Sequence, residues 1–170
     1  MVVLKRQNKQ ENTKIYNGIL KKLRDELGNK VPIDHVGSTA IPNMYGKNII
    51  DILIGAKNEN EIEELTTKII NLGYYPGRNS KGMIYRFFAS TEEETKSGDV
   101  HIHLAIMDND RYKDFLIIKQ YLLNNKEEVK KYSDFKRKIL KNGTFIREDY
   151  KSVKSEYVSA LLDRARKYFN

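Results

Sequence analysis

The sequence lacks cysteine, long apolar runs and a secretion signal. Without cysteine, disulfide bonds and thiolate metal sites are excluded, and the absence fits a reducing compartment. No apolar run approaches the roughly 18 residues that a membrane-spanning helix needs. The first twelve residues, MVVLKRQNKQEN, do not contain the apolar core of a secretion signal. We therefore expect a cytoplasmic protein that does not enter a membrane.

Acidic residues are outnumbered by basic ones. The chain has 31 Lys and Arg against 23 Asp and Glu, a net charge of +8, and much of the excess lies in residues 126–170, with 13 basic and 7 acidic residues. A basic segment favours anionic substrates or nucleic acid. A solvated, lysine-rich helical surface explains the pattern equally well. RNA is the weaker alternative, because Arg-rich and aromatic-stacking strand motifs are missing.

The apolar pattern predicts a single α+β domain over residues 1–170. We expect a nucleotidyltransferase-like small mixed sheet flanked by helices within residues 13–108, and a helical C-terminal portion over residues 109–170. Strands are expected at residues 31–36, 48–56, 82–89 and 99–107. Helices are expected at residues 13–27 and 58–72, followed by three more after residue 109, the last from about 147.

The first candidate site lies in HVGSTAIPNMYGKNIIDILI, residues 35–54. Gly37 and Ser38 follow a strand, and such a turn can present backbone N–H groups and a hydroxyl to phosphate oxygens. A Gly-Ser pair alone is most often an ordinary turn. Asp51 strengthens the prediction, since a carboxylate within an apolar strand is costly to bury unless it is paired or binds a metal. A salt bridge or cap is the structural alternative.

Two histidines on a later strand are candidate metal ligands. His101 and His103 alternate and so share one face of the strand. Together with Asp51 they could form a two-histidine, one-carboxylate metal site. The alternative is a pair of histidines held by hydrogen bonds on a half-exposed strand.

Three basic residues are candidates for binding an anion. Lys136 and Lys154 each share a helical face with apolar residues, where a lysine either extends its amine to solvent or meets an anion. Tyr150 lies one turn before Lys154, so these two are expected to act together. Arg86, in the strand motif YRFF, is the third candidate.

Five segments resemble the GrpB family, a branch of the nucleotidyltransferase superfamily. They are HVGSTAIPNMYGKNIIDILI, YRFF, HIHL, YSDFKRKI and DYKSVKSEYV, and the similarity spans residues 13–165. The family pattern looks like HxGSTAVPGLxxKPIID, then HLHV, then a Tyr and Lys pair on each of two helices. Asn43, Met44 and Asn48 depart from it mildly.

The resemblance implies a mixed sheet, a Gly-Ser turn that holds nucleotide phosphates, and carboxylates that hold magnesium. The superfamily pattern has a second acid two residues after the first, but Leu53 stands there, and the strand expected to carry a third acid has His101 and His103. Mg²⁺ prefers oxygen ligands, whereas imidazole suits Zn, Mn, Fe or Ni. The divalent metal is therefore expected to be Mg or Mn, with Zn as the alternative; Asp99 is a candidate substitute acid.

Three functions remain open from the sequence. The first is a nucleotidyltransferase, in which the nucleotide phosphates bind Gly37, Ser38, Thr39, Lys47 and Arg86. Its metal binds Asp51, His101 and His103. Transfer to an unknown small molecule or RNA end is assisted by Lys136, Lys154 and Tyr150. The second is a non-catalytic module that binds a nucleotide or other phosphorylated ligand. The third is a metal-dependent hydrolase that uses Asp51, His101 and His103.

Overall fold

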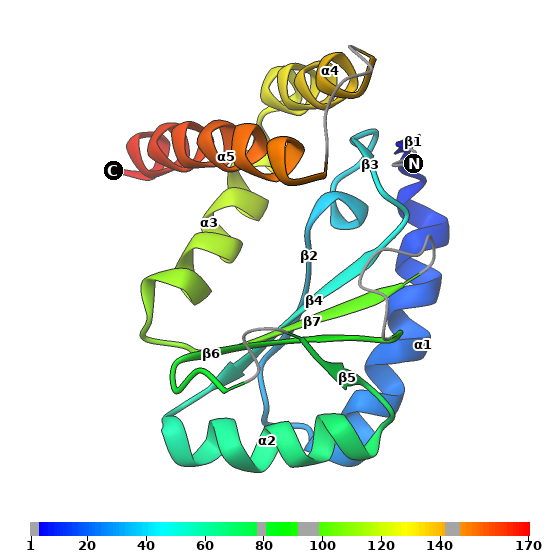
Figure 1. Ribbon diagram of the computed structural model, residues 1–170, viewed down its shortest axis with the longest axis vertical. Helices are drawn as coiled ribbons and strands as arrows, with labels where there is room; N and C mark the ends of the chain where they lie inside the picture. The colour runs from blue at the N-terminus through cyan, green and yellow to red at the C-terminus, as the bar shows by residue number, and fades with distance from the viewer. Residues whose placement is uncertain (1–3, 78–80, 92–98, 142–146) are drawn as a thin grey trace.

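A five-stranded mixed sheet forms the centre of the computed structural model, which describes residues 4–77, 81–91, 99–141 and 147–170 (Figure 1). Its strands, in spatial order, are β2 (Ile33–Val36), β4 (Ile50–Ala56), β7 (Val100–Ile106), β6 (Tyr85–Ala89) and β5 (Tyr75–Pro76). The β4 and β7 strands are parallel, and the other neighbours are antiparallel. The predicted α+β class and the mixed sheet are confirmed.

Two helices, α1 (Lys9–Leu27) and α2 (Glu59–Asn71), cover one face of the sheet (Figure 1). Asn8 caps α1, which therefore begins four residues before the predicted start. The predicted cap of α2 is present, since the Asn58 side chain accepts a hydrogen bond from the Glu61 N–H. The apolar stripes of both helices pack on every second residue of the central strands, including Ile50, Ile52, Ile54, Ile102 and Leu104.

The opposite face of the sheet carries the candidate site residues. Two rows of cross-strand neighbours are Val36, Asp51 and His101, and Leu53, His103 and Phe87. Because side chains alternate along a strand, both rows point to the same face, away from α1 and α2. Helix α3 (Asp110–Asn124) packs on this face through an apolar cluster that contains Val36, Leu53, Tyr85, Ala105 and Tyr112.

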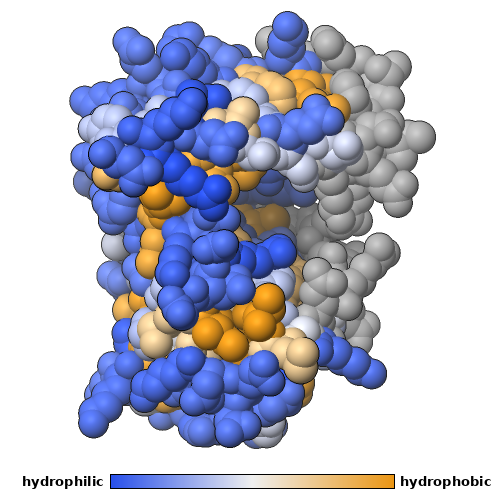
Figure 2. All heavy atoms as spheres, turned by 90° about the vertical axis from the view of Figure 1, so that its left-hand side faces the viewer, coloured by the Kyte–Doolittle hydropathy of each residue, from blue (hydrophilic) through white to orange (hydrophobic). Residues whose placement is uncertain are grey.

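The C-terminal helices α4 (Lys126–Lys141) and α5 (Arg147–Phe169) form a layer beyond the edge of the sheet (Figure 1). They pack with α3 and with the segment that follows β2, and the buried residues between them are Ile41, Met44, Tyr121, Leu122, Val129, Tyr132, Leu161 and Ala165. Figure 2 shows the molecule from the left-hand side of Figure 1. The surface seen there is largely hydrophilic, with apolar side chains visible below the layer of α4 and α5.

Three short elements near the site were not predicted. They are the two-stranded pair β1 (Lys5–Arg6) and β3 (Tyr45–Gly46), and the 3-10 turn η1 (Ser38–Ala40). Elements this short show no periodicity that a sequence pattern could reveal. None of the helices in the described part of the chain has the length and hydrophobicity needed to cross a bilayer.

Candidate functional site

A cavity of about 490 Å³ lies between the sheet, η1 and helices α3, α4 and α5. Its size falls in the range of about 300–1,000 Å³ that small-molecule sites occupy. The cavity brings together most of the predicted site residues, namely Gly37, Ser38, Lys47, Asp51, His101, His103, Lys136 and Lys154. Gly37 and Arg111 line it and are also exposed, so the cavity opens to solvent.

The Gly37–Ser38 turn sits directly against Asp51. Gly37 has a φ of 71°, a conformation that favours glycine, and a Cβ added there would lie 2.2 Å from Asp51 Oδ2. On its other side, a Cβ added at Gly46 would lie 2.1 Å from the Ser38 hydroxyl oxygen. Glycine at both positions therefore lets the backbone approach these polar side chains closely.

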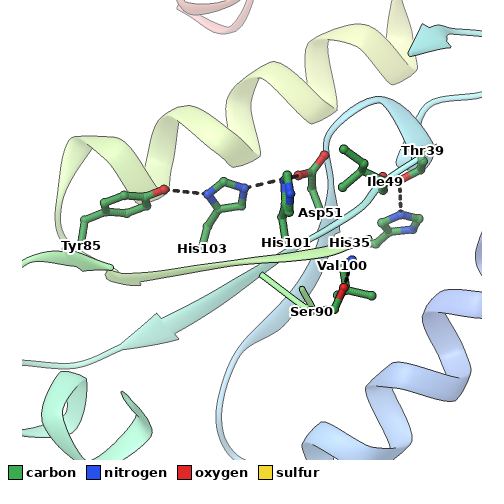
Figure 3. A network of polar contacts seen from close by, with 9 residues as sticks. All are labelled: His35, Thr39, Ile49, Asp51, Tyr85, Ser90, Val100, His101 and His103. Carbon is green, nitrogen blue, oxygen red and sulfur yellow. Dashed lines mark hydrogen bonds and ion pairs between the residues drawn. The ribbon is translucent and has the colours of Figure 1, made fainter. Parts of the chain in front are cut away.

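Thr39 supports the turn and does not line the cavity. Its buried hydroxyl donates to the Ile49 carbonyl oxygen at 3.0 Å and lies 2.9 Å from Nε2 of His35 (Figure 3). His35 stacks on Tyr16 on the α1 side of the sheet. Burial, aided by the charge of Lys119, lowers the pKa of His35 to about 4, so this ring is neutral at pH 7. Thr39 is thus placed to hold the turn, and the phosphate contact predicted for it stays a prediction.

Asp51 is contacted by both histidines of β7. Its Oδ1 lies 3.5 Å from Nδ1 of His101 and 3.5 Å from Nε2 of His103. Burial raises the pKa of Asp51, but the hydrogen bonds and charges of the two imidazoles outweigh it and hold this pKa well below its usual range. Asp51 is consequently a carboxylate at neutral pH.

A third side chain extends this contact into a row (Figure 3). The Tyr85 hydroxyl lies 2.8 Å from Nδ1 of His103, and burial raises the pKa of Tyr85, so the hydroxyl stays protonated. The two nitrogens of the His103 ring therefore contact Tyr85 on one side and Asp51 on the other. The row fixes the orientation of the His103 ring beside the Asp51 carboxylate.

The three predicted metal ligands, Asp51, His101 and His103, lie together, and the metal itself stays a prediction. In residues 4–77, 81–91, 99–141 and 147–170, no three His, Asp or Glu side chains are placed to hold one metal ion. Leu53, fully buried, occupies the position of the second acid. Asp99 does not replace it, because its Oδ1 accepts from the Thr91 hydroxyl at 3.1 Å and its side chain does not line the cavity. We therefore derive no chemistry through a metal.

Lys136 and Lys154 reach the cavity from α4 and α5. Lys136 is 3% exposed, with its Nζ 4.4 Å from the centre of the Tyr132 ring. Burial, aided by the charge of Lys154 and opposed by that of Asp51, lowers the pKa of Lys136 to about 7. Burial also lowers the pKa of Lys154. Within the described part of the chain neither lysine forms an ion pair, and the opposing charge that acts on both is that of Asp51 in the same cavity.

Two further cations from α3 line the cavity, and neither was predicted. Arg111 lies 3.8 Å above the Tyr85 ring, and Lys119 Nζ lies 3.4 Å from Asp34 Oδ1. Residues 111, 115 and 119 all line the cavity, and a spacing of four places them on one helical stripe. That spacing is visible in the sequence, but only the packing of α3 on the sheet turns this stripe toward the cavity.

Arg86 does not reach the cavity. Alternation along β6 places it on the α2 face, where it is 5% exposed and bonds to the Glu63 carboxylate, the Thr66 hydroxyl and the Gly82 carbonyl. The sequence prediction of a phosphate-binding role is not supported by this placement. Tyr150 lies in α5, but its side chain is outside the described residues.

Comparisons with known proteins identify relatives along nearly the whole chain. The sequence model of the family described as GrpB protein matches residues 3–164. A UPF0157 protein of Pseudomonas aeruginosa is 29% identical over 133 residues, which are 78% of this chain and 54% of that protein. The glutamate-rich protein GrpB of Alkalihalophilus pseudofirmus is 26% identical over 140 residues, 77% of this chain and 76% of that protein.

A solved structure has the same fold. The crystal structure of GrpB from Enterococcus faecalis superposes with a TM-score of 0.81 at 19% identity, covering 99% of this chain and 100% of that one. At this identity the likeness establishes the fold alone. The chain spans only about half the length of the Pseudomonas relative. Since the family match covers almost all of its residues, the chain belongs to the GrpB protein family.

Proposed function

We propose that this protein binds the phosphate groups of a nucleotide or another phosphorylated small molecule in the cavity. One observation carries the proposal. The Gly37–Ser38 turn from the sheet layer and two lysines that form no ion pair with a described residue, Lys136 and Lys154, line the same cavity although they are about a hundred residues apart in sequence.

The charge of the cavity lining favours an anion. Five basic side chains line it, and they are Lys47, Arg111, Lys119, Lys136 and Lys154. Only two acidic side chains do so: Asp51, which contacts the two histidines, and Asp114, which pairs with Arg166 at 2.8 Å. Among the basic side chains, Lys119 pairs with Asp34, which lies outside the lining. A cavity with this excess of positive charge attracts phosphate, and a turn of exposed backbone N–H groups binds it directionally.

The rest of the cavity suits an organic group attached to the phosphate. Its wall beside the C-terminal helices is aliphatic, with side chains such as Ile41, Ile118, Leu122, Val158 and Leu162. Ligand sites usually combine such an apolar lining with a few placed polar groups. A nucleotide fits this description, with its phosphates toward Gly37 and its base toward the helices.

The proposal stops at binding. Nucleotidyl transfer through carboxylate-held metals needs acids that this sheet lacks, because Leu53 replaces one and Asp99 lies outside the cavity. The hydrolase alternative built on Asp51, His101 and His103 stays a prediction, and the proposal does not use it.

Isothermal titration calorimetry tests the proposal. Inorganic phosphate, AMP and ATP are titrated in the presence of EDTA into the wild-type protein and into Lys136→Met and Lys154→Met. We expect binding of at least one ligand, weakened about tenfold or more in each variant, since a hydrogen bond to a charged group contributes about 1.5–3 kcal/mol. Lys68→Met, which removes a surface lysine paired with Glu64, is the matched control. No binding at millimolar ligand, or equal affinity in all variants, would refute the proposal.

A further inference from the structure

We infer that Lys136 forms a reversible imine with the carbonyl group of a phosphorylated aldehyde held in the cavity. The inference rests on the proposed phosphate binding and adds a reactive group and a ligand class to it.

Lys136 is the more buried of the two lysines that reach the cavity from α4 and α5, since Lys154 is only half-buried. The side chain of Lys136 is almost completely buried, yet it lines the cavity. In the described part of the chain its amine makes no ion pair or hydrogen bond. It lies over the ring of Tyr132, 4.4 Å from the ring centre. Lysines with assigned partners, such as Lys68, Lys113 and Lys131, instead have their amines tied to carboxylates on the surface. Unlike the amines of these three surface lysines, the Lys136 amine can be reached by a bound ligand without breaking an ion pair.

The surroundings also favour the reactive form of the amine. Only the neutral amine attacks a carbonyl, and a lysine becomes neutral more easily when it is desolvated and close to another cation. Lys154 is the other cation, and Asp51 is the opposing charge. Burial and the charge of Lys154 lower the Lys136 pKa to about 7, which favours the neutral amine far more than in an exposed lysine.

The reaction needs no oxidant, reductant or metal. Nζ of Lys136 attacks the carbonyl carbon to give a carbinolamine, and the carbon–oxygen bond then breaks. The oxygen leaves as water with the two protons that the amine carried, and a C=N bond remains. A phosphate anchored at the Gly37–Ser38 turn and by Lys154 would hold the aldehyde beside Lys136, and such positioning raises the effective concentration of the reacting group.

Trapping with pyridoxal 5′-phosphate tests the inference. The protein is incubated with this phosphorylated aldehyde at a ratio near one, reduced with sodium borohydride, and mapped by peptide mass spectrometry. We expect Lys136 to carry the dominant label, and Lys136→Met to lose it with an unchanged circular dichroism spectrum. Lys68→Met, the surface control, should be labelled at Lys136 like the wild type. Label spread over exposed lysines with Lys136 unmodified would overturn the inference.

Two further arms separate this inference from the proposed function. Pyridoxal, which lacks the phosphate, should label Lys136 at least tenfold more slowly, and excess inorganic phosphate should protect Lys136 from pyridoxal 5′-phosphate. If calorimetry detects phosphate binding but Lys136 stays unlabelled, the imine is refuted and the proposed function stands. If both aldehydes label Lys136 equally and phosphate gives no protection, the anchored ligand is refuted along with the proposed function.

Discussion

Lys136 is the residue whose chemistry depends most on its neighbours. An isolated lysine is protonated at any physiological pH, whereas this one has a pKa of about 7 because it is buried next to Lys154. Binding an anion stabilises the protonated amine, so a rise in pH through 7 removes the charge that the anion needs. The groups that act on Lys136 across the cavity are Lys154 from α5 and Asp51 from β4.

Sulfate affinity is expected to depend on pH for this reason. Sulfate keeps its charge between pH 6 and 8, so any change in affinity reports on the protein. A lysine with a pKa near 7 predicts that affinity falls about tenfold from pH 6 to pH 8. Calorimetry at the two values measures this change, and Lys136→Met should flatten it. A wild-type affinity that is constant, or that increases with pH, contradicts the assignment.

Gly37 is the second residue on which the site depends. We predict that Gly37→Ala lowers the free energy of unfolding by about 1–3 kcal/mol and weakens phosphate binding, since the left-handed backbone is strained for alanine and the added Cβ would meet Asp51. Gly18→Ala is a matched control, because Gly18 lies within α1 with open space around it. That change should stabilise the protein by about 0.5–1 kcal/mol. Urea denaturation of both variants makes the comparison, and equal stabilities would count against the geometry of the turn.

At the scale of elements, the sequence was sufficient wherever the signal was local. Helix α2 has its predicted cap, and the apolar run around Asp51 forms the predicted central strand, because caps and continuous apolarity are properties of neighbouring residues. The Gly37–Ser38 turn and Asp51 could be placed side by side for the same reason.

Face and register were harder to predict. Arg86 lies on β6 between Tyr85 and Phe87, and a shift by one position reverses which face a side chain occupies. The sequence did not reveal that α2 presents Glu63 and Thr66 to that face. Likewise the cations Arg111 and Lys119 became site residues only through the packing of α3 on the sheet.

Arg86 of β6 bonds to side chains of α2, so we expect its loss to change the stability of the fold without changing ligand affinity. Arg86→Met should lower the free energy of unfolding by about 1–3 kcal/mol, because the buried Thr66 hydroxyl and the Gly82 carbonyl lose a partner. Phosphate affinity should stay at the wild-type value, because Arg86 lies on the other face of the sheet. Thermal unfolding and calorimetry on the same sample measure both. Lost affinity in a folded variant would restore the original prediction for Arg86.

At the scale of the whole molecule, the cavity lies between two layers that meet over an apolar interface. The sheet layer supplies the turn and Asp51, and the C-terminal layer supplies Lys136 and Lys154. A ligand that contacts both would link them, so binding should stabilise the fold as one unit. The family match spans both layers, from residue 3 to residue 164.

Hydrogen exchange is expected to report this link. A ligand at a hundred times its dissociation constant stabilises the native state by about 2.7 kcal/mol. With the tightest of the phosphate ligands, we predict slower exchange both in residues 36–41 and in α4 and α5, measured by mass spectrometry. Protection confined to one layer would mean that the ligand does not bridge the cavity. The Lys136→Met variant under the same conditions serves as the control.

A crystal structure of the protein grown with AMP tests the central claim most directly. The account predicts the phosphate within hydrogen-bond distance of the backbone N–H groups at Gly37 and Ser38 and of the Nζ atom of Lys136 or Lys154, with the base against the aliphatic wall of α3 and α5. A phosphate bound only on the outer surface, with the cavity filled by water at saturating AMP, would contradict it.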